Sequence, residues 1–137
     1  MLKILLIFLG GGVGASARYL ASVGVRAWID GRDPAPSDES LLALVPLGTL
    51  GVNLLGCLLI GLLMPILAGE GAKEETRLLL IVGVLGGFTT FSAFGLETWT
   101  LIGEQRIGWA IAYVLASVLF GLGAVAIGHA IGVRVAG

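Results

Sequence analysis

The chain has 137 residues, of which 57% are hydrophobic and 12% are charged, and its formal net charge is −1. A water-soluble domain carries about a quarter charged residues, so this composition predicts a membrane protein and argues against a soluble enzyme. The near-neutral charge offers no basic surface for a phosphate backbone, which argues against nucleic-acid binding. The single cysteine, Cys57, cannot form a disulfide within the chain.

Four long stretches of the chain lack charged residues. The stretches without Asp, Glu, Lys or Arg are 4–17, 40–69, 78–96 and 107–133. A helix needs about 20 largely apolar residues to cross a bilayer, so we predict an all-α membrane protein with four transmembrane helices. The predicted spans are approximately 2–28, 41–68, 77–101 and 107–132. The connections between them are short, so residues 1–137 are predicted to form one four-helix transmembrane domain.

Proline and glycine residues indicate a loop and possible helix contacts. Residues 30–40 are polar and contain prolines, which is typical of a solvated loop. The spacings Gly10-x-x-x-Gly14 and Gly128-x-x-x-Gly132 would let two helix backbones approach closely. Glycine is also frequent in membrane helices in general, so the spacing leaves both interpretations open.

The basic residues are balanced between the two ends of the predicted bundle. If the N-terminus is cytoplasmic, that side holds Lys3, Lys73, Arg77 and Arg134. The opposite side holds Arg18, Arg26, Arg32 and Arg106. Because a Lys/Arg bias sets orientation, a chain without that bias is predicted to insert both ways. Two inverted copies would reproduce the inverted-repeat architecture of larger transporters, so we predict an antiparallel, dual-topology homodimer.

The second span carries a polar face. Thr49, Asn53 and Gly56 are spaced i, i+4 and i+7, which places them on one side of a helix. Asn53 can donate two hydrogen bonds and accept two. The spacing fits either an amide clamp between helices or the wall of a crevice that holds water or an ion.

The most unusual stretch of the third span is Gly83-Val84-Leu85-Gly86-Gly87-Phe88-Thr89-Thr90-Phe91-Ser92-Ala93-Phe94-Gly95. Paired glycines followed by two β-branched threonines predict a break in this helix near the bilayer midplane. Backbone groups freed at that depth are tolerated only within protein or an aqueous cavity, where they can coordinate ions. Phe91 and Phe94, at i and i+3, face a common direction and serve either packing or a pore.

The chemistry available at this break favours an anion over a cation if ring edges face the pore. An aromatic ring has a negative face and a positive edge. Ser92, Thr90 and Asn53 can add O–H and N–H donors. The centres of the last three spans contain no Lys or Arg, so an anion would bind weakly enough to be conducted.

The fourth span repeats Tyr113, Ser117 and Gly121 at i, i+4 and i+8. This face could be a hydroxyl track for an ion that sheds water. It could equally be a packing face, with Tyr113 in the aromatic belt at the membrane interface.

The remaining polar residues of the spans have less specific signals. Arg18 could capture an entering anion, cap helix carbonyls or extend to the membrane surface. Glu97 ends a charge-free stretch and is either a mouth residue or a solvated helix end. His129 and Cys57 are expected to pack. The tryptophans near predicted span ends, as in an aromatic belt, are Trp28, Trp99 and Trp109.

Three motifs together resemble the CrcB/Fluc fluoride channels. They are Gly11-Gly12-Val13-Gly14-Ala15-Ser16-Ala17-Arg18-Tyr19, Gly48-Thr49-Leu50-Gly51-Val52-Asn53-Leu54-Leu55-Gly56 and Gly86-Gly87-Phe88-Thr89-Thr90-Phe91-Ser92-Ala93-Phe94. The match covers three of the four predicted helices in order, and the third motif is the most specific. The resemblance implies a passive channel in a bacterial-type inner membrane, through which fluoride leaves the cytoplasm. It also implies an antiparallel homodimer with two pores and a central structural Na⁺.

The resemblance also assigns residues to these roles. The implied fluoride pore comprises Asn53, Phe91, Phe94, Ser92, Tyr113 and Ser117, and its entrance comprises Arg18 and Glu97. The backbone carbonyls implied to hold Na⁺ are those of Gly86 and Thr89. The sequence departs from the family pattern at two positions of the implied ion path: Ala93 stands where many members have a hydroxyl residue, and Gly121 interrupts the fourth-span track.

Other functions explain the sequence less well. A proton-coupled small multidrug transporter would need a titratable carboxylate within the membrane, and the first span has none. A non-conducting membrane subunit would account for the glycine-rich helices but not for the motif that ends in Phe94. An enzyme is the least supported, because His129 is isolated and Ser92 has no evident base.

Overall fold

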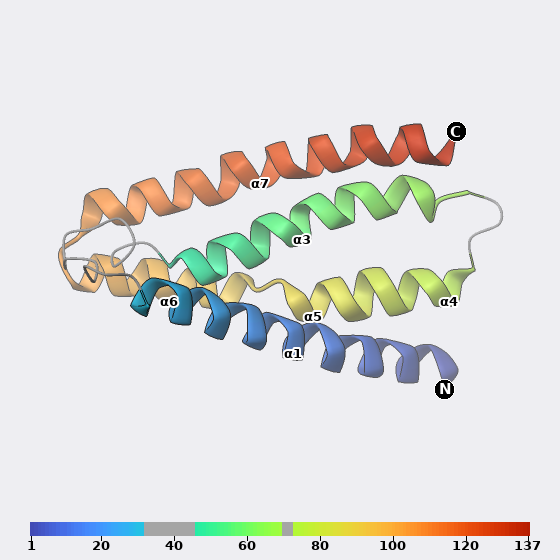
Figure 1. The fold of residues 1–137 in the computed structure, drawn as a ribbon, viewed down its shortest axis with the longest axis horizontal. Helices are drawn as coiled ribbons and strands as arrows, with labels where there is room; N and C mark the ends of the chain where they lie inside the picture. Colours follow the sequence, from blue (N-terminus) through green and yellow to red (C-terminus); the bar gives the residue numbers. More distant parts are fainter. Residues whose placement is uncertain (32–45, 70–72) are drawn as a thin grey trace.

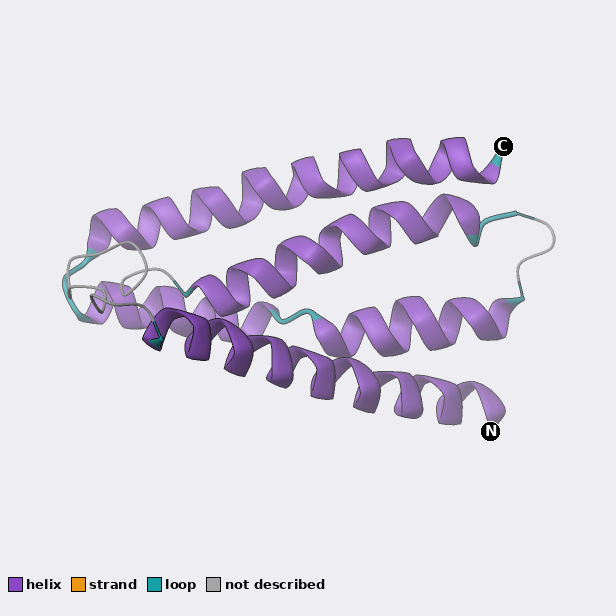
Figure 2. Ribbon diagram, viewed as in Figure 1, coloured by secondary structure: helices purple, strands orange, loops and turns teal. Residues whose placement is uncertain are grey.

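The computed structural model describes residues 1–31, 46–69 and 73–137. The described chain consists of helices joined by short loops (Figure 2). The predicted polar loop at 30–40, with Arg32, and the first residues of the predicted second span, 41–45, lie largely or wholly outside these residues.

The long helices are α1 (Leu2–Asp30), α3 (Leu47–Ile66) and α7 (Ile107–Ala136). Between α3 and α7, the third span is built from four consecutive pieces. They are α4 (Glu74–Arg77), the π-helix η1 (Leu78–Leu85), α5 (Gly86–Phe88) and α6 (Phe91–Gly103). Among the described residues, four helical segments are long and apolar enough to cross a membrane, as the charge-free stretches predict.

The helices pack as two pairs (Figure 1). α3 runs along α7 for most of its length, and α1 runs along η1 and α5. The two chain termini lie at one end of the bundle, while α6 and the beginning of α7 lie at the other. α6 makes few close backbone contacts with the other helices, so large side chains fill the space between α6 and α7.

Both pairs depend on glycine at their closest approach. A β-carbon added to Gly14 would collide with the carbonyl oxygen of Val84, and one added to Gly128 would collide with that of Leu58. Both glycines belong to the Gly-x-x-x-Gly spacings, and the structure confirms close helix contact at each.

The buried core is small, and most large apolar side chains face outward. One buried cluster, formed by Leu101, Ala110 and Tyr113, lies where α6 meets α7. Exposed Leu, Ile, Val and Phe side chains cover the long helices, which is the expected surface of a protein whose solvent is lipid.

The tryptophans lie at span ends, as predicted. Trp28 and Trp99 are exposed, and Trp109 is partly buried. All three belong to the end of the bundle opposite the termini, because α1 ends there, α6 reaches it and α7 begins there (Figure 1). All three tryptophans of the sequence therefore lie near one end of the described bundle.

Candidate functional site

The centre of the site is the junction between α5 and α6. α5 ends at Phe88, α6 begins at Phe91, and the two threonines between them are extended. Thr89 has φ −82° and ψ 158°, and Thr90 has φ −150° and ψ 116°. Extended backbone cannot continue the helical hydrogen-bond ladder, so the polar groups at this junction need other partners.

Asn53 on α3 supplies two of these partners. Its Nδ2 donates to the carbonyl oxygen of Thr90 at 3.0 Å, and its Oδ1 accepts from the Thr90 amide at 2.8 Å. The side-chain amide thus pairs with the Thr90 backbone as a second strand would. This geometry makes Asn53 the interhelical clamp that its spacing allowed, and Asn53 also lines a cavity.

The two threonine hydroxyls complete the junction. Thr90 is the N-cap of α6, and its Oγ1 accepts from the Ala93 amide at 3.2 Å. Thr90 Oγ1 also lies 3.3 Å from Ser92 Oγ. The carbonyl of Leu85 accepts from both the amide and the hydroxyl of Thr89, at 3.0 and 2.9 Å. Side chains therefore terminate one helix and start the next.

These bonds leave two carbonyls without their usual helical donors. In a continuous helix the Thr90 amide would donate to the Gly86 carbonyl, but it donates to Asn53 instead. The Ala93 amide would likewise donate to the Thr89 carbonyl, but it donates to Thr90 Oγ1. Carbonyl oxygens of this kind are suitable ligands for a hard cation such as Na⁺.

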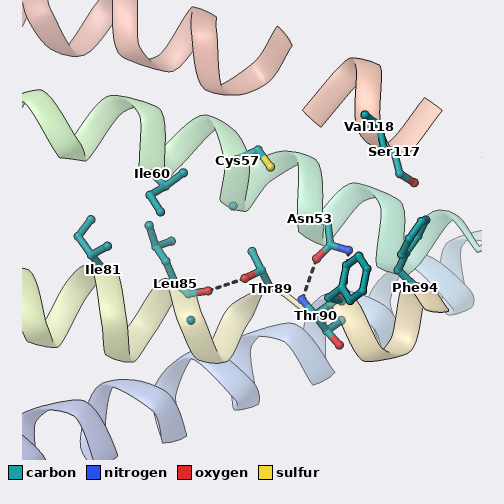
Figure 3. Close-up of a pocket in the computed structure, with 13 residues that line it drawn as sticks. Asn53, Cys57, Ile60, Ile81, Leu85, Thr89, Thr90, Phe94, Ser117 and Val118 are labelled. Carbon is teal, nitrogen blue, oxygen red and sulfur yellow. Dashed lines mark hydrogen bonds between the residues drawn. The ribbon is translucent and has the colours of Figure 1, made fainter. Parts of the chain in front are cut away.

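A cavity of about 390 Å³ lies beside the junction (Figure 3). Its walls come from α3, η1, α5, α6 and α7. The residues that line it are Asn53, Gly56, Cys57, Ile60, Ile81, Leu85, Gly86, Thr89, Thr90, Phe91, Phe94, Ser117 and Val118. The lining is mostly apolar, with a few polar groups gathered around Asn53, which is the usual composition of a small-ligand or ion site.

Aromatic rings form a chain along α6 and α7. The ring centroids of Phe91 and Phe94 are 5.5 Å apart with an interplanar angle of 44°. Those of Phe94 and Tyr113 are 5.3 Å apart at 49°. Tilted pairs at this distance direct ring edges toward neighbouring groups. Phe91 is 83% exposed, so most of its ring is free to contact something outside this chain.

Glu97 on α6 forms hydrogen bonds with α3 and α7. Its Oε1 accepts from the hydroxyl of Thr49 at 2.6 Å, and its Oε2 accepts from the hydroxyl of Tyr113 at 2.7 Å. Both oxygens of the carboxylate are therefore engaged within the bundle, in a partly buried position. Glu97 lies within α6 rather than at its end, so the interpretation of Glu97 as a solvated helix end is wrong.

A second cavity, of about 290 Å³, lies on the α1 side of the junction. Its lining residues are Ala15, Arg18, Tyr19, Ser22, Thr49, Thr90 and Ala93. Thr90 lines both cavities, so it lies between the cavity lined by Arg18 and the cavity lined by Phe91 and Phe94.

The structure brings most of the predicted site residues together. The first cavity gathers Asn53, Phe91, Phe94, Ser117, Gly86 and Thr89. The other four lie outside its lining: Ser92 is exposed beside Thr90, Tyr113 is buried against Phe94, Glu97 bonds to Thr49 and Tyr113, and Arg18 lines the second cavity.

Some local roles were missed or mistaken in the sequence interpretation. Thr90 was expected only as a donor, yet its backbone and hydroxyl organise the junction. Cys57, expected only to pack, lines the first cavity. His129 is exposed on α7, so the expectation that it packs within the chain is wrong. The N-cap pattern Thr90-x-x-Ala93 could have indicated where α6 begins, but nothing local indicates the partner of Asn53.

Comparison with known proteins places the chain among related sequences. A profile of the family described as CrcB-like protein, Camphor Resistance (CrcB) matches residues 5–129. The chain is 41% identical over 124 residues to a protein of Methylobacillus flagellatus named "Fluoride-specific ion channel FluC", covering 89% of this chain and 88% of the relative. It is 44% identical over 126 residues to a protein of the same name from Paracoccus denitrificans, covering 92% and 90%. A third, from Salinibacter ruber, is 44% identical over 128 residues, covering 93% and 87%.

Proposed function

This chain belongs to the CrcB-like protein family, and from that premise we propose that it is a fluoride-specific ion channel. It is a multi-pass protein of the bacterial inner membrane. The observation that carries the proposal is its similarity, over 89% and 92% of its length, to relatives named fluoride-specific ion channels. A channel is not an enzyme, and we propose no catalytic reaction for this chain.

The channel would export fluoride passively and thereby relieve its toxicity. Hydrogen fluoride is a weak acid that crosses membranes as a neutral molecule and ionises in a near-neutral cytoplasm, where the anion accumulates. A negative-inside membrane potential favours the exit of each unit of negative charge by about 2.3 kcal/mol per 100 mV. A pore therefore needs neither ATP nor a coupled ion.

The proposed ion path passes through the first cavity. Phe94 and Phe91 would present ring edges to fluoride, and Asn53 and Ser117 would provide donors. The cavity lining supports this path because it joins these residues in one space. Arg18, in the second cavity, would attract the anion at the entrance.

Ser92 and Tyr113, also predicted to line the ion path, lie outside the first cavity. Ser92 is exposed and close to Thr90, so its hydroxyl could extend the donor set. The Tyr113 hydroxyl donates to Glu97. We therefore propose that Tyr113 contributes to the path through its ring rather than through its proton.

We also propose that two copies pair in inverted orientation, giving two pores. The balanced basic residues support this arrangement. So does the aromatic belt: one copy carries tryptophans at one end only, and an inverted copy would supply them at the other membrane interface. The exposed ring of Phe91 would then meet the second subunit.

A Na⁺ ion at the centre of this dimer would be held by the carbonyls of Gly86 and Thr89. The support is that the amides of Thr90 and Ala93, which would bond these carbonyls in a helix, donate elsewhere. When bound, the ion would supply positive charge that offsets the carbonyl dipoles from the two inverted copies. Asn53 would keep the junction extended by bonding the amide and the carbonyl of Thr90.

Growth in fluoride tests the proposed function. A bacterial strain without a fluoride exporter should regain growth in fluoride medium when it expresses this chain, and not when it expresses Phe94→Ile at the same membrane level. A strain that stays sensitive although the protein is inserted would contradict the channel and favour a non-conducting subunit.

Labelling from the two sides of the membrane tests dual topology. A tag at the N-terminus should be labelled equally from the cytoplasmic side and from the outside. One-sided labelling would rule out the inverted pair while leaving the fluoride channel to be judged by growth.

A further inference from the structure

Glu97 joins three helices through one carboxylate. It lies on α6, and its two oxygens accept separate hydrogen bonds from Thr49 on α3 and Tyr113 on α7, at 2.6 and 2.7 Å. Each hydroxyl is the donor of its bond, so both hydroxyl protons point at Glu97. Glu97 lines neither of the two cavities beside the junction.

Tyr113 is held at both ends of its side chain. It is the most deeply buried large side chain among the described residues, at 1% exposure. Its hydroxyl is bonded to Glu97 at the far end of the ring, and the ring itself packs against Phe94 with centroids 5.3 Å apart. Because the hydroxyl oxygen lies on the long axis of the ring, this tether fixes where the Tyr113 ring lies beside Phe94, and the two ring planes are inclined at 49°.

We propose that Glu97 is a positioning residue that orients the Phe94 ring at the cavity by tethering Tyr113. The inference rests on the proposed function, because it gives the orientation of Phe94 a role in fluoride conduction. It replaces the interpretation of Glu97 as a pore-mouth residue. The Glu97 carboxylate holds the Tyr113 hydroxyl, and the Tyr113 ring packs against the Phe94 ring, which lines the cavity of the proposed ion path.

A purely structural role makes a different prediction. If Glu97 only joined helices, losing either of its hydrogen bonds would lower thermal stability without changing the Phe94 ring. If Glu97 positions Phe94, only the bond to Tyr113 matters for the ring. The two hydroxyl partners of the same carboxylate therefore provide matched variants, Tyr113→Phe and Thr49→Val.

The ring can be observed directly by placing 4-fluorophenylalanine at position 94 and recording ¹⁹F NMR spectra of the purified protein in fluoride-free detergent solution. We expect one narrow resonance in the otherwise unaltered protein. Tyr113→Phe and Glu97→Leu should shift or broaden it, whereas Thr49→Val should leave it unchanged. Glu97→Gln, which can still bond both hydroxyls, should restore the narrow resonance.

Fluoride efflux from liposomes provides the functional readout. Tyr113→Phe and Glu97→Leu should each reduce the efflux rate by about tenfold, and the double variant should be no slower than either, because both changes remove the same contact. Thr100→Val is the control, since its hydroxyl donates to the Leu96 carbonyl of its own helix at 3.0 Å. Its efflux rate should equal that of the unaltered protein.

Several results would overturn the inference. They are a resonance that Tyr113→Phe leaves unchanged, a resonance that Thr49→Val alters equally, efflux at the unaltered rate despite a disordered ring, or additive losses in the double variant. Tyr113→Phe removes one oxygen atom and keeps the ring, so it remains decisive if Glu97→Leu fails to fold. An unaltered protein that conducts no fluoride would refute the proposed function, and the NMR comparison would still decide whether Glu97 orients Phe94.

Discussion

The two halves of the third span are held in place by different forces. η1 and α5 lie against α1, where glycine lets the two backbones touch: a β-carbon on Gly14 would strike the Val84 carbonyl. α6 makes fewer close backbone contacts and is held by side chains instead, through the buried cluster of Leu101 and Tyr113 and through the hydrogen bonds of Asn53 and Glu97. Its outer face, with Phe91 and Trp99, is exposed.

The contrast indicates why the site lies where the halves meet. η1 and α5 pack backbone to backbone against α1, so they hold one side of the junction in a fixed position. α6 is held by side chains and can present a polar and aromatic face, and its hydrogen bonds are effective because hydrocarbon offers no competing water. The junction between them releases backbone groups that Asn53 and Thr90 then satisfy.

The largest effect is expected from breaking the glycine-packed half. Gly14→Ala forces a β-carbon into the Val84 carbonyl, so α1 and η1 must separate, and we expect a loss of about 1–3 kcal/mol of stability together with most of the fluoride efflux. Thermal unfolding in detergent, followed by size-exclusion chromatography, measures it. Gly12→Ala is the matched control, because its β-carbon would meet open space. Equal melting temperatures for the two variants would refute the account of the α1 seam.

A comparable but more local effect is expected at the junction. Asn53→Asp keeps an acceptor for the Thr90 amide. It replaces the Asn53 Nδ2 donor, which lies 3.0 Å from the Thr90 carbonyl oxygen, with a carboxylate oxygen that cannot donate. We expect a cost of about 1–3 kcal/mol for the unsatisfied groups and a block of anion passage by the added negative charge. Thr100→Val, which removes an exposed hydroxyl bonded to the Leu96 carbonyl of its own helix, should alter neither stability nor efflux greatly. Undiminished fluoride efflux through Asn53→Asp would restrict Asn53 to a structural clamp.

The aromatic face should affect conduction far more than folding. Phe94→Ile and Phe91→Ile remove the ring edges, so we expect fluoride efflux to be lost. The stability cost should be only about 1 kcal/mol for Phe94, which loses its contact with Tyr113, and less for the exposed Phe91. Phe120→Ile, at an exposed position of α7, should conduct normally. Efflux at the unaltered rate from both Phe91→Ile and Phe94→Ile would eliminate the ring-edge mechanism.

The smallest effect is expected at the end of the glycine-packed half. Lys3 on α1 and Glu74 on α4 form a 2.7 Å ion pair whose side chains are 57% and 61% exposed. Solvent screens such a pair, so Lys3→Gln should leave the melting temperature and the efflux rate unchanged within error. A clear drop in melting temperature would show that side-chain charges, and not only glycine contacts, hold α1 to the third span.

Much of the fold is predictable from the sequence because hydropathy and helical spacing are local properties. The charge-free stretches predicted the four apolar helices, and the i, i+3 spacing of Phe91 and Phe94 predicted rings that face one direction. The ends of the helices were less accurate. The third span begins at Glu74 rather than at residue 77, because its polar first turn is helical although it is not apolar.

The partners of the polar groups could not be predicted in the same way. Asn53 was recognised as a possible clamp, but its partner Thr90 lies 37 positions away, and Glu97 bonds a residue 48 positions away. Such pairings depend on how helices are rotated and shifted relative to one another, which spacing within one helix does not encode. The π-helical geometry of η1 was missed for a related reason, since its residues are also good formers of an ordinary apolar helix.

The central claim, that this chain conducts fluoride selectively, is tested most directly in liposomes that contain the purified protein. Vesicles loaded with potassium fluoride or potassium chloride receive valinomycin, so that potassium can leave with the anion, and anion-selective electrodes record the efflux. The account predicts rapid loss of fluoride and negligible loss of chloride. Loss of both anions at similar rates, or of neither from a well-folded preparation, would contradict it.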